Sequence, residues 1–152
     1  MKKILMAAIA SSALLAFGGS AQDTVSSPIG LWKTIDDHSG KPRSLMRVTE
    51  SNGEFLGKVE KLLREPGEDQ HPKCGKCEGA LKDQPILGMT VMTGMKHEGN
   101  SNEYVDGRLF DPDSGNTYKG KMTLIDNGKK LNVRGYIGIP LLGRSQTWLR
   151  EE

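Results

Sequence analysis

Segments with the composition of β-strands, separated by short turn signals, recur along most of the chain. A spacing of about 8–12 residues between turns is typical of β-sandwiches and β-barrels. No amphipathic segment is long enough to form a helix that would organise the fold. We therefore predict an all-β domain with strands near residues 30–36, 44–50, 54–62, 86–95, 103–110, 116–125, 130–138 and 143–150.

The residues between these segments favour hairpins. Asn52-Gly53 and Asn127-Gly128 are pairs that tolerate the positive φ angles of tight hairpin turns. In the longer turn over 111–116, proline fixes one φ angle and glycine supplies a reversed residue. Consecutive strands are therefore expected to pair antiparallel.

Glycines inside the predicted strands favour a small barrel over a flat sheet. Interior glycine weakens a flat strand, but it allows sharp bends and close packing where a barrel curves. Such glycines occur at Gly57, Gly107, Gly120 and Gly135.

The two ends of the expected domain carry residues that can hold a barrel closed. Trp32 lies in the first predicted strand, and Trp148 and Arg150 lie in the last. A guanidinium stacked on an indole contributes roughly 0.5–2 kcal/mol. We predict that Trp32, Trp148 and Arg150 close the barrel where its first and last strands pair.

The first residues have the pattern of an export signal. Lys2 and Lys3 precede a mostly apolar stretch over 4–17, and small residues at 19–21 suit a signal peptidase that cuts before Gln22. The stretch is too short for a transmembrane helix, which needs about 20 apolar residues. We expect a signal peptide over 1–21 and a periplasmic or secreted protein.

After cleavage, the chain would consist of a flexible leader over 22–29 and a single domain over 30–152. The chain has 21 basic and 19 acidic residues, and the signal removes two lysines, so 19 of each sign remain. A net charge of zero gives no electrostatic footprint for nucleic acid or for an anionic membrane. No later apolar run is long enough to span a membrane, so we expect neither a nucleic-acid partner nor a membrane span in the mature chain.

The long connection over 64–85 contains both cysteines of the chain, Cys74 and Cys77. In an exported protein, oxidation favours a structural disulfide, which for so short a loop stabilises by about 2 kcal/mol. Two alternatives stay open. The cysteines could form a redox pair beside neighbouring lysines, or bind zinc together with His71 and either His97 or His38. We predict the disulfide, no metal site and no cofactor.

We find no catalytic constellation in the sequence. The paired carboxylates Asp36-Asp37 and Asp111/Asp113 lie at turns, where aspartate commonly bonds nearby backbone. The chain has neither a Gly-x-Ser-x-Gly elbow nor a glycine-rich phosphate loop before a helix. We predict no catalytic residues and no enzyme.

Seven short stretches of the sequence together form a pattern that is typical of one protein family. They are Gly30-Leu31-Trp32, Gly57-Lys58-Val59, Cys74-Gly75-Lys76-Cys77, Pro85-Ile86-Leu87-Gly88-Met89, Asp111-Pro112-Asp113-Ser114-Gly115 with Tyr118, Arg134-Gly135-Tyr136-Ile137-Gly138, and Leu142-Gly143-Arg144-Ser145-Gln146-Thr147-Trp148 with Arg150. The chain thereby resembles a bacterial family of exported domains of unknown function with a lipocalin-like, calycin-type β-barrel. The resemblance implies an eight-stranded antiparallel up-and-down barrel with one long Cys-containing loop. By analogy with lipocalins, it also implies ligand binding.

We therefore expect an exported protein that carries a small, partly apolar or amphiphilic ligand in a barrel cavity. The candidate lining residues are Met46, Val48, Met89, Val91, Tyr118, Met122 and Tyr136. If strand arginines point inward, an anionic group could bind at Arg108, Arg134 and Arg144. The alternative is a structural or interaction module of the cell envelope, with a filled core, no ligand and a contact surface on the 64–85 connection.

Overall fold

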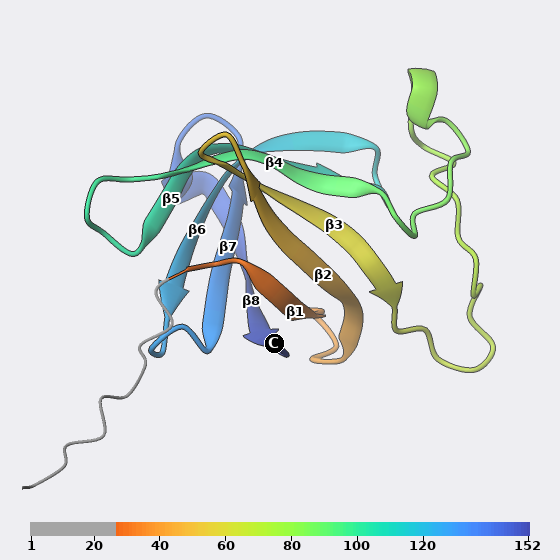
Figure 1. Ribbon diagram of the computed structural model, residues 1–152. Coiled ribbons are helices and arrows are strands. Elements are labelled where there is room, and N and C mark those ends of the chain that lie inside the picture. The colour runs from red at the N-terminus through yellow and green to blue at the C-terminus, as the bar shows by residue number, and fades with distance from the viewer. Residues whose placement is uncertain (1–26) are drawn as a thin grey trace, which may run out of the picture.

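The computed structural model describes residues 27–152, which contain one closed barrel of eight antiparallel strands in up-and-down order (Figure 1). The predicted fold class is confirmed. The expected signal peptide over 1–21 lies outside the described residues, as does most of the expected leader. Among residues 27–152, no helix has the length and apolar character needed to cross a membrane.

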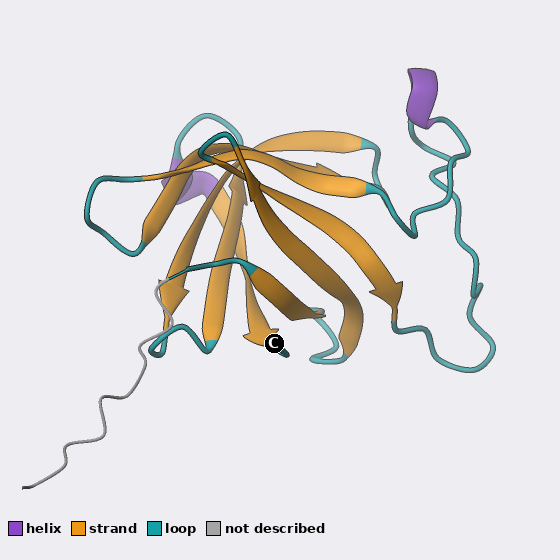
Figure 2. Cartoon of the chain, in the orientation of Figure 1, coloured by secondary structure: helices purple, strands orange, loops and turns teal. Residues whose placement is uncertain are grey.

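Figure 2 shows that strands dominate the chain and that two short 3-10 turns, η1 and η2, are its only helical elements within the described residues. The elements are β1 (Gly30–Ile35), β2 (Pro42–Ser51), β3 (Glu54–Leu62), η1 (Gly79–Leu81), β4 (Thr90–His97), β5 (Glu103–Asp111), β6 (Asn116–Ile125), β7 (Lys130–Tyr136), η2 (Pro140–Leu142) and β8 (Gly143–Arg150).

The strand boundaries lie within two residues of the prediction except at the start of β4. β4 begins at Thr90 rather than at residue 86, because Ile86 donates its N–H to Pro72 within the long connection and Gly88 has a φ of 86°. β7 ends at Tyr136 rather than at residue 138, since Gly138 adopts a φ of 76° that turns the chain. In both places a glycine with positive φ interrupts the extended backbone next to the strand.

The up-and-down order places alternate connections at opposite ends of the barrel. The short turns after β2, β4 and β6 share one end with both termini of the barrel, which we call the closed end. The connections over 36–41, 63–89, 112–115 and 137–142 share the other, which we call the open end.

A tryptophan and an arginine hold the closed end together. β1 pairs with β8, and Trp32 lies opposite Arg150 in that ladder. The Arg150 guanidinium lies 4.1 Å from the centroid of the Trp32 ring, which is fully buried. The indole N–H donates to the carbonyl of Pro28 at 2.8 Å. Trp32 and Arg150 therefore meet where the first and last strands pair, whereas Trp148, the third residue of that prediction, lies opposite Leu131 of β7.

The same arginine fixes the chain that enters β1. Its guanidinium donates to the carbonyls of Ser27 at 2.7 Å, Ile29 at 2.9 Å and Gly128 at 2.6 Å. The last three residues of the predicted leader, 27–29, are thus held beneath the barrel by hydrogen bonds from Arg150 and Trp32.

Methionine side chains fill the closed half of the barrel, and irregularities in β4 and β5 allow them to pack there. Gly94 in β4 and Asp106 in β5 have φ angles of 68° and 61°, and the ladders on either side shift register around them. The bulge in β4 lets Met92 and Met95, three positions apart, both lie fully buried. At Gly107, a Cβ atom would lie 2.3 Å from the Met95 sulfur, so only glycine leaves this space.

Candidate functional site: a cavity at the open end

The open half of the barrel is hollow. A cavity of about 780 Å³ opens between the strands and the open-end connections. Ligand pockets in proteins commonly measure about 300–1,000 Å³. Its apolar lining includes Met46, Val59, Leu62, Ile86, Val91, Met92, Leu109, Phe110, Val133 and Trp148. A second hollow of about 670 Å³ lies at the closed end beside the β2–β3 turn, but strand-end and turn residues line it rather than barrel walls.

Ion pairs tie the connections around the mouth of this cavity. Arg144 at the start of β8 pairs with Asp37 in the β1–β2 connection. Arg43 reaches Asp36 at 3.4 Å and Asp113 at 3.0 Å, which links that connection to the β5–β6 turn. The pairs are solvent-accessible, so their contribution is modest and sensitive to salt.

Hydrogen bonds stabilise the ionised form of two rim carboxyl groups, those of Asp36 and Asp37. The pKa of Asp36 falls from 3.8 to about 2, chiefly because its carboxylate accepts the backbone N–H and the hydroxyl of Ser39. The Arg144 guanidinium, hydrogen-bonded to Asp37, lowers the pKa of that carboxyl. These aspartates hold the rim loops and neutralise the rim cations they contact.

One cationic side chain lining the cavity is left unpaired. Arg64 is half-buried, lines the cavity and makes no hydrogen bond or ion pair with any of residues 27–152. Its planar guanidinium can bind a carboxylate or phosphate through two parallel hydrogen bonds. The cavity therefore combines apolar walls with a free anion-binding group at its edge.

Two tyrosines add hydrogen-bonding capacity. Tyr118 and Tyr136 line the cavity, and their hydroxyls bond to nothing in the described part of the chain. Each can donate to, or accept from, a polar atom of a bound molecule.

The structure brings some of the predicted lining residues to this cavity and not others. Met46, Val91, Tyr118 and Tyr136 line it. Val48, Met89 and Met122 are buried in the core and do not reach it. Strand alternation correctly indicates an inward direction for Val48 and Met122, but it carries no information on depth along the barrel axis. Both residues lie nearer the closed end than the cavity does.

The three predicted anion-binding arginines have three different positions. Arg108 is exposed and does not line the cavity. Arg134 donates to the backbone carbonyls of Pro140 and Leu141. Arg144 does lie at the mouth, but Asp37 occupies its guanidinium.

Sequence reasoning missed Arg64 as a cavity residue. It assigned this residue only to the edge of the 64–85 connection, where a charged residue in a loop carries no directional signal. The contribution of Leu109 and Phe110 to the cavity wall was likewise missed, because the bulge at Asp106 changes which residues of β5 face inward.

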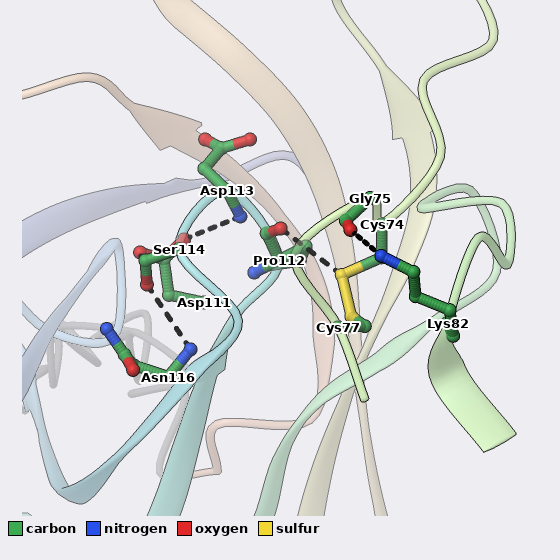
Figure 3. The surroundings of a disulfide bond; sticks show 9 residues. All are labelled: Cys74, Gly75, Cys77, Lys82, Asp111, Pro112, Asp113, Ser114 and Asn116. Carbon is green, nitrogen blue, oxygen red and sulfur yellow. Dashed lines mark hydrogen bonds between the residues drawn. A yellow bond between two sulfur atoms is a disulfide. The ribbon is translucent and has the colours of Figure 1, made fainter. Parts of the chain in front are cut away.

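The long connection forms part of the cavity wall. Cys74 and Cys77 form a disulfide, as predicted, and both are buried. Figure 3 shows this disulfide against the β5–β6 turn. The Cys74 sulfur lies 3.2 Å from the carbonyl oxygen of Pro112, and Lys82 donates a hydrogen bond to the Gly75 carbonyl.

The turn and the disulfide loop approach each other too closely for any side chain at Gly115. A Cβ atom there would lie 2.3 Å from the backbone oxygen of Lys76. This docking places Ile86 in the cavity lining.

The histidines that were weighed as zinc ligands are not brought together. His97 lies at the closed-end terminus of β4, where it stacks on Tyr104 with 4.8 Å between ring centroids. His38 and His71 lie in open-end connections. Within residues 27–152, no three metal-ligating side chains cluster.

Comparison with known proteins supports the fold. A family described as "Uncharacterized protein conserved in bacteria (DUF2147)" matches residues 30–150. The solved structure of protein HP1028 from Helicobacter pylori, described as belonging to the lipocalin family, is similar with a TM-score of 0.68 and 19% identity. The similarity covers 83% of this chain and 84% of that one. A search of curated proteins finds no match.

Proposed function

The chain belongs to the DUF2147 family of bacterial proteins, and we propose that it is an exported carrier of one small amphiphilic molecule with an acidic group. The apolar part of the ligand enters the open-end cavity, and its carboxylate or phosphate binds Arg64. The single observation that carries the proposal is an unpaired guanidinium at the edge of an apolar cavity of about 780 Å³.

The chemistry of the lining supports an amphiphile. A purely polar ligand would leave the methionine, valine and leucine walls in contact with water, at a cost of about 25 cal/mol per Å². A purely apolar ligand would desolvate Arg64 without giving it a partner, which is costly for a charged group. A molecule with both characters satisfies the walls and the guanidinium at once.

The alternative of a ligand-free envelope module has weaker support. Its premise is a filled interior, and only the closed half of the barrel is filled. The 64–85 connection, its candidate contact surface, supplies Arg64 to the cavity, and Ile86 just beyond it also lines the wall.

Native mass spectrometry of protein purified from its own bacterium tests the carrier proposal. We expect a one-to-one complex that disappears in Arg64→Gln and persists in the matched control Arg108→Gln, whose side chain is exposed outside the cavity. A second variant, Gly135→Leu, fills the cavity, because a Cβ atom there meets only ordinary contacts beginning at 3.5 Å. No bound species, or equal binding in all variants, would contradict the proposal.

Export is part of the proposal and has its own test. The pattern of residues 1–21 supports it, and a disulfide in so small a domain fits an oxidising compartment. We expect fractionation to recover a protein that begins at Gln22 outside the cytoplasm. Recovery of the uncut chain in the cytoplasm would contradict export.

A further inference from the structure

The β7–β8 connection exposes a continuous apolar surface. We call residues 137–142 the apolar tip. Ile137 is 71% exposed, Ile139 55%, Leu141 80% and Leu142 74%. No charged residue occurs between Arg134 and Arg144. The other exposed large apolar residues among those described are scattered, so the concentration at this loop requires an explanation.

Hydrogen bonds from Arg134 and within the loop itself fix the backbone of the apolar tip. Arg134 donates to the carbonyl of Pro140 at 2.6 Å and to that of Leu141 at 3.3 Å, and it also donates to the Ser145 hydroxyl at 2.8 Å. The N–H of Leu142 donates to the Ile139 carbonyl at 3.1 Å, and proline has no N–H to satisfy. These contacts fix a short turn whose apolar side chains point into solvent.

Satisfied backbone groups matter in an apolar environment. A peptide carbonyl moved out of water without a partner costs several kcal/mol. At the tip, the carbonyls nearest the most exposed side chains already accept hydrogen bonds from Arg134. The tip can therefore enter hydrocarbon at a lower backbone cost than an ordinary loop.

The flanking residues suit a water–lipid boundary. Tyr136 precedes the tip and Arg144 follows it, separated from it by Gly143. Tyrosine is enriched at membrane interfaces, and long cationic side chains keep their charge in the headgroup layer while their stems contact apolar material. Ile137 and Leu142 also line the cavity mouth, so the tip and the mouth are adjacent.

We propose that the apolar tip inserts into the interfacial layer of a lipid bilayer and holds the barrel mouth against the membrane surface. A six-residue protrusion buries too little area for a stable protein interface, which needs about 1,200–2,000 Å² in total. A bilayer needs no complementary surface. Because the tip is uncharged, attachment rests on apolar burial and depends little on anionic lipid or salt. The inference does not depend on whether the cavity carries a ligand.

Co-sedimentation with phosphatidylcholine vesicles tests this attachment. The variant Leu141→Ser with Leu142→Ser removes the two most exposed side chains, and the control Ile125→Ser with Leu149→Ser removes two exposed aliphatic side chains elsewhere. Every protein carries the same N-terminal segment, so differences between them report the changed residues. We expect the tip variant to lower the partition coefficient by about tenfold or more, and the control to leave it nearly unchanged.

A second variant keeps the proposal testable if the double change disturbs folding. Leu141→Trp should bind vesicles at least as tightly as the unchanged protein, and its emission should shift to shorter wavelength when vesicles are added. Failure of the unchanged protein to bind vesicles would overturn the proposal, as would equal losses in the tip and control variants. Self-association in vesicle-free solution that the tip variant abolishes would assign the tip to a second copy of the chain instead.

Discussion

Two arginines of this protein differ in how many contacts their guanidinium groups make within the described residues. Arg150 stacks on Trp32 and donates to carbonyls from the entering chain and from the β6–β7 turn. Burial beneath the barrel lowers the pKa of Arg150, because removing the guanidinium from water disfavours its charged form. Arg64 has no partner among residues 27–152 and faces a cavity. The guanidinium of Arg150 is therefore engaged in contacts within the fold, whereas that of Arg64 is free to bind a ligand.

Replacing Arg150 should therefore weaken the closed end. We expect Arg150→Met to reduce the free energy of unfolding by about 3 kcal/mol, because several charge-assisted hydrogen bonds and one cation–π contact are lost together. Arg108→Met, at an exposed position, should change it by less than about 0.5 kcal/mol. Denaturant unfolding measures both, and equal effects would contradict the assigned role of Arg150.

The lowered pKa of Asp36 at the rim leads to a prediction about pH. The pKa of Asp36 is lowered to about 2, so its folded form binds a proton less readily than the unfolded chain does. Its hydrogen bonds to the 38–39 backbone should therefore be fully present above about pH 4, and lost as the pH falls through about 2. Carboxyl carbon NMR should show this midpoint, and a midpoint near 3.8 would contradict the geometry of the loop.

At the scale of strands and loops, the prediction from sequence was accurate wherever a local rule decides the structure. Asn-Gly pairs, interior glycines and alternation predicted most strand limits correctly. The bulge at Asp106 could not be predicted, since a non-glycine residue with positive φ depends on what packs around it. For the same reason, Arg64 gave no sign of lining the cavity: its position depends on how the whole 63–89 connection packs.

The disulfide should stabilise this connection locally. We expect the pair Cys74→Ser and Cys77→Ser to cost about 2 kcal/mol and to speed hydrogen exchange over 72–89, because the loop would detach from the β5–β6 turn. Exchange in β6 and β7 should change much less. Uniform acceleration across the barrel would show that the loop is part of the global folding unit instead.

At the scale of the whole molecule, the barrel is divided into a filled half and a hollow half. Methionines and Trp32 pack the closed half, and rim ion pairs surround the cavity at the other end. The eight-stranded closure was predictable from strand number and terminal residues, but the depth to which side chains fill the interior was not. That depth depends on packing volumes, which a one-dimensional pattern of inward residues does not contain.

Methionine-methyl NMR with dodecanoate as the probe tests the carrier account most directly. Met46 and Met92 line the cavity, whereas Met95 and Met122 are buried without lining it. We predict saturable shifts that reach completion at one equivalent and are largest for Met46 and Met92, with Arg64→Gln weakening the binding. No shift at saturating probe, or equal shifts at all four methyl groups, would contradict a binding site in the open half of the barrel.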